Sequence, residues 1–554
     1  MCNAKVTLTP SSEPNHSPGV TILMSEATLA APWWKRGVIY QIYPRSFADS
    51  NGDGIGDLAG IAARLDHVAT LGVDAIWLSP IFPSPMADFG YDVADYTGVE
   101  PMFGDLAAFD RLLAAVHARG LRLLLDFVPN HSSTQHPWFV ESRSSRDNPR
   151  RDWYIWRDPA PGGGPPNNWI SDMGGPAWEL DPVTGQYYLH TFLKEQADLN
   201  WRNPAVAQVM TDVMRFWLDR GVDGFRIDVL WHIVKAEGLP DNPANPDWRE
   251  GLAEKLRVLQ HHSTDQPEAH AFTRQFRQLA DSYGDTALVG EIFLPRDRLM
   301  RWYGTEAEPG VHLPFNFELI ENQWDRDTLA ALIAGYDAAI PVHGWPNWVI
   351  GSHDAARIAA RIGERQARVA AMLLLTLRGT PTLYQGDEIG IGTVDIPPHR
   401  IRDPQDLRQP GMGLGRDRSR TPMAWDASSN AGFSTVEPWL PLHPDWRTRN
   451  VAAQEEDPAS MLRLYRRLLA ARRAIPALSL GRMTLREAAP DILAYERQHG
   501  DERLLVVLNL GSEPREVTLP DATRPGRIIV ATGTRDMFDG TIDADEAYVV
   551  ELLA

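Results

Sequence analysis

The chain has 554 residues, which is long enough for several domains or for one large barrel with attached domains. Hydrophobic residues make up 43% and charged residues 23%, a balance that is typical of soluble globular proteins and excludes a disordered or fibrous chain. The formal net charge of −19 would repel a phosphate backbone, which argues against nucleic acid as a partner.

Residues 1–31 show no hydrophobic periodicity, and we interpret them as a flexible leader outside the fold. They lack the charged, apolar and small-residue regions of a secretory signal, and the chain has no apolar run of the roughly 18 residues that a membrane span needs. The single cysteine, Cys2, allows no intramolecular disulfide and agrees with a reducing compartment. We therefore expect a cytoplasmic protein with no membrane partner.

Eight short apolar runs alternate with segments of helical spacing, which is typical of parallel strands buried on both faces. The runs are 38–43, 75–78, 121–127, 224–228, 287–292, 313–317, 348–351 and 382–384. Eight such units favour an α/β fold with a closed (β/α)8 TIM barrel over residues 32–127 and 201–474. A doubly wound open sheet is the alternative, since the pattern alone does not show closure.

Three further segments depart from this pattern. Residues 128–200 are rich in Pro, Gly and Trp, which predicts a small inserted domain, domain B, after the third strand. Residues 230–270 are expected to form a loop and helix over the mouth of the barrel and to shape substrate length. From 475 to 554 short alternating runs predict a C-terminal antiparallel β-sandwich domain. Its predicted strands are 492–497, 504–509, 516–519, 527–531 and 547–553.

Carboxylates lie at the ends of three predicted strands: Asp228 in GFRIDV, Glu291 in LVGEIF and Asp354 in VIGSHD. In a barrel they would converge on one rim. Two carboxylates in an apolar-walled site can divide the work, one ionised as a nucleophile and one protonated as an acid. A helix cap or an ion pair is the more common role of an isolated acid, but three acids together favour an active site.

Other polar residues lie near these acids in the sequence. Arg226 is two residues before Asp228 on the same strand, so both side chains should point to the same side. There Arg226 would hold the carboxylate ionised, although a structural ion pair gives the same pattern. His131 in DFVPNHSS and His353 beside Asp354 could donate to sugar hydroxyls, with a structural role as the alternative for each.

Seven segments occur in the order found in the α-amylase superfamily of glycoside hydrolases, which the chain resembles over about residues 33–554. They are GVIYQIYPRSF (37–47), DFVPNH (126–131), QADLN (196–200), GFRIDV (224–229), GEIF (290–293), SHD (352–354) and GTPTLYQGDEIG (379–390). Within the superfamily the chain looks like the α-glucosidase and oligo-1,6-glucosidase branch. The resemblance implies a retaining, exo-acting α-glucosidase that works through a covalent β-glucosyl-enzyme, with transglucosylation as a side reaction. A glucosyltransferase or isomerase acting on sucrose or maltose is the alternative, and a non-catalytic relative is a more distant one.

The resemblance also implies roles for individual residues. Asp228 would be the nucleophile, Glu291 the general acid/base and Asp354 the third acid, which distorts and holds the sugar ring. The residues implied around the terminal glucose are Asp88 and Tyr91 in DFGYD, His131, Arg226, His353, and Arg416 in GRDRSRTPM, with Arg420 as the rival of Arg416. Burial is expected to raise the pKa of Glu291 and Arg226 to lower that of Asp228, which predicts a bell-shaped pH profile.

The chain departs from the family pattern at two positions, and its motifs point to two different linkages. Ser352 stands where the family usually has Asn, and an apolar residue follows Glu291; neither removes a catalytic group. Val229, after the nucleophile, resembles members that prefer α-1,6 bonds, while LWHIVKAEG resembles branches that act on α-1,4 bonds. The sequence therefore leaves the linkage open.

The segment DSNGDGIGD (49–57) resembles half of an EF-hand loop, with side-chain oxygens suited to a hard cation at alternating positions. The similarity to α-glucosidases implies a structural Ca²⁺ here, held by Asp49, Asn51, Asp53, Asp57 and the carbonyl of Ile55. A metal-free loop held by Asx turns is the alternative. We expect no organic cofactor, an α-glucoside or oligosaccharide as the partner, and a monomer or homodimer.

Overall fold

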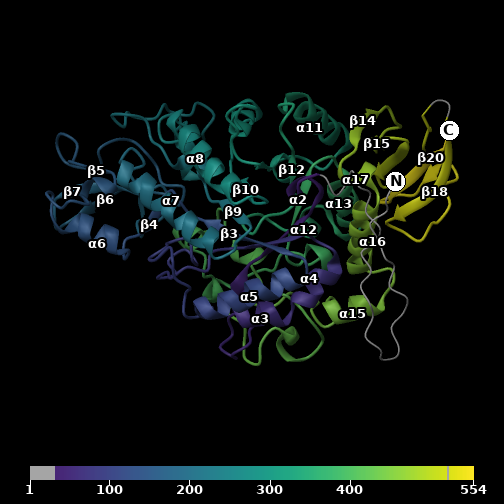
Figure 1. The fold of residues 1–554 in the computed structure, drawn as a ribbon, viewed down its shortest axis with the longest axis horizontal. Coiled ribbons are helices and arrows are strands. Elements are labelled where there is room, and N and C mark those ends of the chain that lie inside the picture. The colour runs from purple at the N-terminus through teal and green to yellow at the C-terminus, as the bar shows by residue number, and fades with distance from the viewer. Residues whose placement is uncertain (1–30, 521–522, 554) are drawn as a thin grey trace.

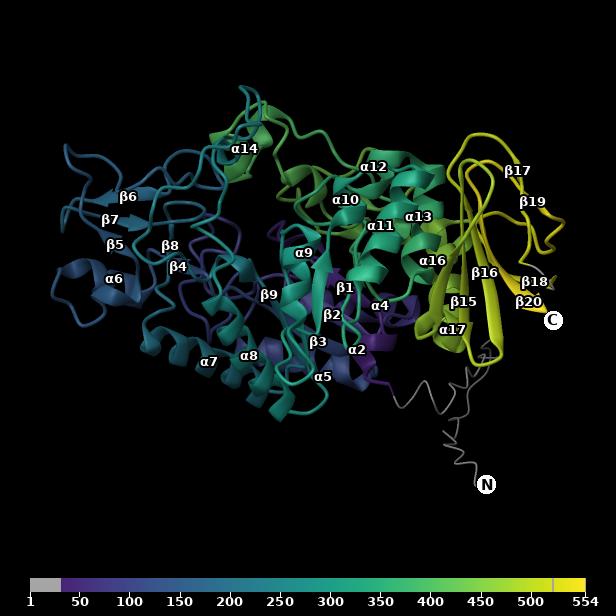
Figure 2. The same cartoon turned by 90° about the horizontal axis from the view of Figure 1, so that it is seen from above.

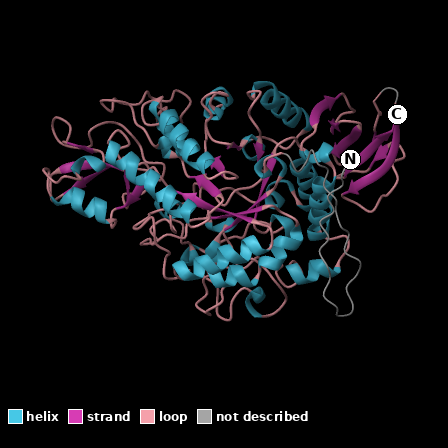
Figure 3. Ribbon diagram, in the orientation of Figure 1, coloured by secondary structure: helices cyan, strands magenta, loops and turns pink. Residues whose placement is uncertain are grey.

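The computed structural model describes residues 31–520 and 523–553; residues 1–30 of the predicted leader, with Cys2, lie outside this part. Figures 1 and 2 show an elongated molecule with a helix-covered barrel at its centre, the segment of β5 to β7 at one end and the C-terminal sheet at the other. Figure 3 shows the barrel strands surrounded by helices. Among the described helices, none is both long and apolar enough to cross a membrane.

Eight parallel strands close into a barrel in the order β1-β13-β12-β11-β10-β9-β3-β2. They are β1 (Ile39–Ile42), β2 (Ala75–Leu78), β3 (Arg122–Phe127), β9 (Gly224–Ile227), β10 (Ala287–Gly290), β11 (Leu313–Asn316), β12 (Asn347–Trp348) and β13 (Thr380–Tyr384). Each predicted run contains or overlaps one of these strands, so the predicted TIM barrel is confirmed and the open-sheet alternative is wrong. The strands are buried along almost their whole length, as their apolar composition requires.

The longer helices present an apolar face to the barrel. In α5, Phe109, Leu112 and Val116 are buried at helical spacing. In α7, the Asn203 side chain accepts a hydrogen bond from the Ala205 amide and so caps the helix start. The longer helices are α5 (Leu106–Ala118), α7 (Pro204–Asp219), α8 (Glu268–Ser282), α11 (Arg326–Ala339), α13 (Glu364–Thr376) and α16 (Met461–Ala474). The shorter ones are α2 (Trp33–Arg36), α3 (Leu58–Ala63), α4 (Leu65–Leu71), α6 (Pro137–Ser144), α9 (Arg296–Leu299), α10 (Glu318–Glu321), α12 (Ile358–Ile362), α14 (Pro404–Arg408), α15 (Val451–Glu456) and α17 (Pro476–Ser479).

Gly224 sets the position of β9. Its φ is +143°, and a Cβ atom added there would lie 2.0 Å from the carbonyl oxygen of Ala287 in β10. Because the two backbones approach so closely, only glycine fits at this position. The strand therefore starts at a defined residue, which places Arg226 and Asp228 at its carboxyl end.

The segment between β3 and β9 holds two small antiparallel sheets, one of β4 and β8 and one in the order β5-β7-β6. The strands are β4 (His131–Ser133), β5 (Trp156–Arg157), β6 (Trp178–Asp181), β7 (Gln186–Leu189) and β8 (Gln196–Asp198). Because β4 follows β3 closely, His131 lies near the carboxyl ends of the barrel strands. We keep the name domain B for residues 128–200.

The C-terminal segment forms a five-stranded antiparallel sheet in the order β14-β15-β16-β20-β18 and a pair of short strands. These strands are β14 (Arg482–Arg486), β15 (Ile492–His499), β16 (Glu502–Asn509), β17 (Arg515–Glu516), β18 (Arg524–Ala531), β19 (Thr541–Ile542) and β20 (Ala547–Leu553). In β16, Val506 packs in the core that includes the barrel helices, whereas Leu505 and Val507 pack in a separate core on the other face. The sequence missed β14, an edge strand with exposed arginines, and β19, which has two residues.

Candidate active site

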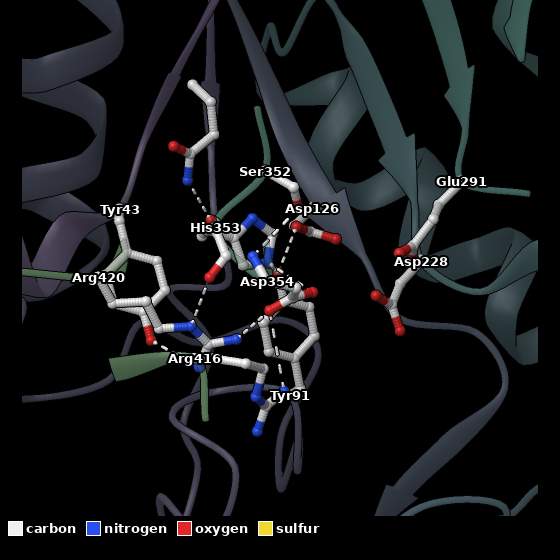
Figure 4. A network of polar contacts seen from close by, with 12 residues as sticks. Tyr43, Tyr91, Asp126, Asp228, Glu291, Ser352, His353, Asp354, Arg416 and Arg420 are labelled. Atoms are coloured by element: carbon white, nitrogen blue, oxygen red, sulfur yellow. Dashed lines mark hydrogen bonds and ion pairs between the residues drawn. The ribbon is translucent and has the colours of Figure 1, made fainter. Parts of the chain in front are cut away.

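A cavity of about 460 Å³ lies at the carboxyl ends of the barrel strands. Seven of the residues predicted to be catalytic or glucose-binding line it: Asp88, Tyr91, His131, Asp228, Glu291, Asp354 and Arg416. Val229, which follows the predicted nucleophile, lines it too. Arg226 and His353 lie directly behind this lining and contact its side chains. Figure 4 shows Asp228 and Glu291 close together, with the group around Asp354 across from them.

One guanidinium joins three carboxylates at the centre of the site. Arg226 Nη1 lies 2.6 Å from Asp228 Oδ1 and 2.8 Å from Asp126 Oδ1. Arg226 Nη2 lies 2.7 Å from Glu291 Oε2. The parallel register pairs Arg226 with Asp126 of β3 on one side and Val289 of β10 on the other, which brings the three strand ends together. No role was predicted for Asp126 from the sequence, although its place at the end of a predicted barrel strand is the signal that could have indicated one.

The shared cation does not balance three buried anions. Burial raises the pKa of Asp228 well above its ordinary value; Arg226 opposes this, and Glu291 and Asp126 add to it. Burial likewise raises the pKa of Asp126 to about 6. Arg226 thus lowers the pKa of Asp228, as predicted from the sequence, but burial and the two neighbouring acids outweigh it, and the pKa is raised overall. Burial and the neighbouring acids thus favour protonation of Asp228 and Asp126, and Arg226 opposes it.

Asp354 has a different environment. Its carboxylate pairs with Arg420 and lies 3.9 Å from Nη1 of Arg416. Burial acts to raise the pKa of Asp354, but His353, Arg420 and Arg416 together outweigh it and hold this pKa well below its ordinary value. Asp354 is therefore ionised at neutral pH.

The two arginines that the sequence treated as rivals both belong to the site. Arg416 lines the cavity, with Nη2 at 2.7 Å from Asp88 Oδ1 and 2.6 Å from Asp403 Oδ1. Arg420 lies behind Asp354 and donates to the carbonyl oxygen of His353 at 3.0 Å. Asp403, which fixes Arg416, lies in a loop without a motif and was not predicted.

The aromatic and imidazole groups form hydrogen bonds around the same space. The Tyr91 hydroxyl donates to Asp126 Oδ2 at 3.1 Å and lies 3.0 Å from Nε2 of His353, with the two rings stacked at an angle of 12°. Burial lowers the pKa of His353 to about 3 and that of His131 to about 4. Both imidazoles are therefore neutral at neutral pH, and a neutral imidazole can donate a hydrogen bond through one nitrogen and accept one through the other.

Val229, the residue after Asp228, has a strained backbone. Its φ is +36°, which a β-branched residue rarely adopts. In this conformation its amide donates to Glu291 Oε2 at 2.9 Å. The backbone of β9 thus holds the carboxylate of Glu291 beside that of Asp228.

The outer wall of the cavity comes from segments in which no individual residue was predicted as part of the site. It includes Asp172, Met173, Phe192, Trp231, Lys255, Leu256, Gln260, Phe293, Glu321 and Gln405. Gln196 also lines the cavity but is buried beside Asp88, to which its Nε2 donates at 3.3 Å. Several of the outer-wall residues belong to residues 230–270, the segment expected to lie over the mouth. Phe293 is 42% exposed and stacks on Phe317, with ring centroids 3.9 Å apart. Such a wall offers both a flat apolar surface and hydrogen-bonding groups to a ligand.

The loop 49–57, predicted to bind calcium, is held by its own hydrogen bonds. Asp49 accepts from the amides of Gly52 and Gly54 at 2.7 and 2.8 Å, and Asp57 caps α3 by accepting from the Gly60 amide at 2.7 Å. Within residues 31–520 and 523–553, no group of three or more His, Cys, Asp or Glu side chains is arranged to hold a metal ion. The remaining lone pairs of the loop oxygens suit Ca²⁺ in chemistry, and the calcium site stays a prediction.

Comparison with known proteins agrees with this geometry. Residues 41–481 match the family described as alpha amylase, catalytic domain, and residues 492–538 match the alpha-amylase SusG C-terminal domain. A "Probable alpha-glucosidase" of Rhizobium meliloti (strain 1021) is 44% identical, with 88% of this chain and 91% of the relative covered. An "Oligo-1,6-glucosidase" of Parageobacillus thermoglucosidasius is 38% identical, with 93% and 96% covered.

Solved structures are similar over the same length. The structure of an alpha-glucosyl transfer enzyme, XgtA, superimposes with a TM-score of 0.89 at 41% identity and covers 94% of this chain and 99% of its own. That of the trehalulose synthase MutB from Pseudomonas mesoacidophila MX-45 has a TM-score of 0.86 at 35% identity and covers 95% and 100%.

Proposed function

The chain belongs to the α-amylase family of glycoside hydrolases, and we propose that it is a retaining, exo-acting α-glucosidase that releases terminal non-reducing glucose from short α-glucosides. The observation that carries this proposal is the pairing of Asp228 and Glu291 through Arg226 at the ends of neighbouring strands. Two carboxylates held close together at one guanidinium are the pair of groups that a retaining glycosidase needs, one as nucleophile and one as acid/base.

In the proposed reaction, Asp228 attacks the anomeric carbon while the proton of Glu291 passes to the leaving oxygen. The bond to the leaving group breaks, and a β-glucosyl ester forms on Asp228. Glu291, now ionised, then takes a proton from water, whose oxygen displaces the ester. Two inversions return glucose in the α configuration, and both carboxyl groups regain their starting states.

The shape of the cavity supports exo action on one glucose unit. Asp88 and Arg416, which are 5% and 8% exposed, form a buried ion pair in its inner wall. The outer wall is more open, with Phe293 at 42% and the Lys255 side chain at 36% exposure. A polar inner end binds the hydroxyls of a terminal glucose, and the leaving group then extends toward the outer wall, where Phe293 offers a stacking surface.

Glucosyl transfer is the second candidate function. Structural neighbours at 41% and 35% identity are named as an alpha-glucosyl transfer enzyme and a trehalulose synthase. Transfer uses the same intermediate, with a sugar or alcohol in place of water. The remaining alternative, a non-catalytic relative, is disfavoured because Asp228, Glu291 and Asp354 all line the cavity.

The test measures glucose release from maltose, isomaltose, sucrose, trehalose and maltotriose by the wild type and by Asp228→Asn. We expect release from maltose or isomaltose that collapses in the variant, and the better substrate then identifies the linkage. Wild-type inactivity on every sugar, or equal activity of the variant, would refute the proposal. At high substrate concentration, mainly new disaccharides would indicate transferase, and mainly glucose would indicate hydrolase.

We also propose a structural Ca²⁺ in the loop 49–57, a cytoplasmic location and a monomeric or homodimeric state. The alternating oxygen ligands support the first, and the single cysteine supports the second. Removal of calcium by a chelator should lower the thermal unfolding midpoint, and added Ca²⁺ should restore it. A midpoint that does not respond to either would contradict the calcium site. Cell fractionation and sedimentation test location and assembly.

A further inference from the structure

The outer wall of the cavity carries a polar cluster that the hydrolytic steps above do not use: Lys255, Asp172 and Gln260. Lys255 Nζ lies 2.8 Å from Asp172 Oδ2, and Gln260 Nε2 donates to Oδ1 of the same carboxylate at 2.9 Å. All three side chains line the cavity that contains Asp228 and Glu291. A ligand in the outer part of this cavity would therefore meet them.

Hydrogen bonds between side chains and backbone atoms of distant segments hold this cluster in place. Asp172 belongs to domain B, whereas Lys255 follows Glu254, whose Oε2 accepts a hydrogen bond from the Gly175 amide at 2.9 Å. Arg408, at the end of α14, donates to the carbonyl oxygens of Met173 and Gly174 at 3.1 and 2.8 Å. The lysine is thus held in one geometry by contacts on both sides, unlike a free surface lysine.

The cluster has hydrogen-bonding capacity left over for a ligand. An ammonium group has three N–H donors. Within the described part of the chain, Asp172 is the one partner of the Lys255 ammonium, and Gln260 Oε1 has no donor from the protein. Two donors on Nζ and one acceptor on Gln260 therefore remain for hydroxyl groups.

The cluster lies on the leaving-group side of the catalytic acids. The carboxylate of Asp172 raises the pKa of Lys255, so the ammonium is charged, and it lines the same cavity as Asp354 and Glu291. Its side chain is 36% exposed, against 5% for Asp88 in the inner wall. With glucose at the inner end, the leaving group or an acceptor would extend toward Lys255.

We propose that Lys255, oriented by Asp172, and Gln260 form a binding site for the hydroxyl groups of the leaving sugar or acceptor sugar. This inference rests on the proposed α-glucosidase function and names the residues that select its leaving group. Hydrogen bonds from an ammonium to hydroxyl oxygens are charge-assisted and stronger than neutral ones. A phenyl leaving group offers no hydroxyl, so the site makes a disaccharide a better substrate relative to phenyl α-glucoside.

The experiment compares kcat/KM for the preferred disaccharide with kcat/KM for phenyl α-glucoside in Lys255→Met. Methionine keeps the length of the side chain but cannot donate. We expect the disaccharide-to-phenyl ratio to fall by about 10- to 100-fold, since a hydrogen bond to a charged group is lost. Lys194→Met, at an exposed lysine that is not part of the cavity lining, is the matched control and should keep the wild-type ratio.

Gln260→Ala provides an independent variant, because it leaves the Lys255–Asp172 pair in place. The same ratio should fall by about 2- to 10-fold, as for a neutral hydrogen bond. A ratio unchanged in both variants, or an equal fall on both substrates, would overturn the proposal and leave Lys255 with a purely structural role. Wild-type inactivity on every α-glucoside would instead refute the proposed function, so the two failures are distinguishable.

Discussion

Replacing Arg226 with methionine should move the acid limb of the pH–activity profile to higher pH. The terminal nitrogens of this guanidinium lie between 2.6 and 2.8 Å from oxygens of Asp126, Asp228 and Glu291. At charge separations of about 4 Å and an effective dielectric constant of about 20, each pair contributes about 4 kcal/mol, or about 3 pKa units. Loss of the cation also favours protonation of the neighbouring acids, which offsets part of this, so a net shift of about 1 to 3 units is expected.

The assay is the pH dependence of kcat/KM on 4-nitrophenyl α-glucoside, whose acid limb reports ionisation of groups in the free enzyme. Arg226→Lys is the matched control. It keeps a positive charge that cannot span two carboxylates at once, so its acid limb should lie between those of the wild type and the methionine variant. A folded Arg226→Met enzyme whose acid limb coincides with that of the wild type would refute the idea that Arg226 lowers the pKa of Asp228.

Three further predictions concern stability. Lys235→Met breaks the buried ion pair between Lys235 Nζ and Asp198, which lie 2.6 Å apart, and should lower the free energy of unfolding by about 3 to 5 kcal/mol in denaturant titrations. The double variant with Asp198→Asn should recover part of this loss. A loss as small as that of Lys194→Met would contradict the prediction. The pairing with Lys235 outweighs burial and lowers the pKa of Asp198. The ionised Asp198 therefore stabilises the fold above the unfolded-state pKa of about 3.9, and this stabilisation should be lost as pH falls through the lower folded-state pKa. Thermal unfolding measured at decreasing pH checks this. Gly224→Ala places a Cβ 2.0 Å from a backbone oxygen and should prevent folding. Gly120→Ala, at φ +70° with no heavy atom within 4 Å of the new Cβ, should lower the free energy of unfolding by only about 1 kcal/mol. Equal soluble yields and equal thermal unfolding midpoints of the two variants would exclude the predicted clash.

The chain order of strands and the chemistry at their ends could be predicted from the sequence. The apolar runs before Asp228, Glu291 and Asp354 mark buried strands because burial on both faces requires continuous apolar residues, which is a local property. Parallel strands in a barrel present their carboxyl ends on one rim, so three acids at strand ends already indicated a shared site. The seven ordered segments then identified the superfamily, and the comparisons confirmed it.

Only the tertiary structure decided how these groups share charge. Asp88 and Arg416 are 328 residues apart, and Lys255 and Asp172 are 83 residues apart, yet each pair is in direct contact. Loop residues such as Asp403 carry no periodic pattern, so their place against Arg416 depends on how the closed barrel brings the loops together. Likewise, the net pKa of Asp228 depends on burial, on Arg226 of its own strand, and on Glu291 and Asp126 at the ends of two other strands. Sequence therefore determines which chemical groups are present at the strand ends, while chain closure determines their contacts, because electrostatic interactions depend on distance in space and not along the chain.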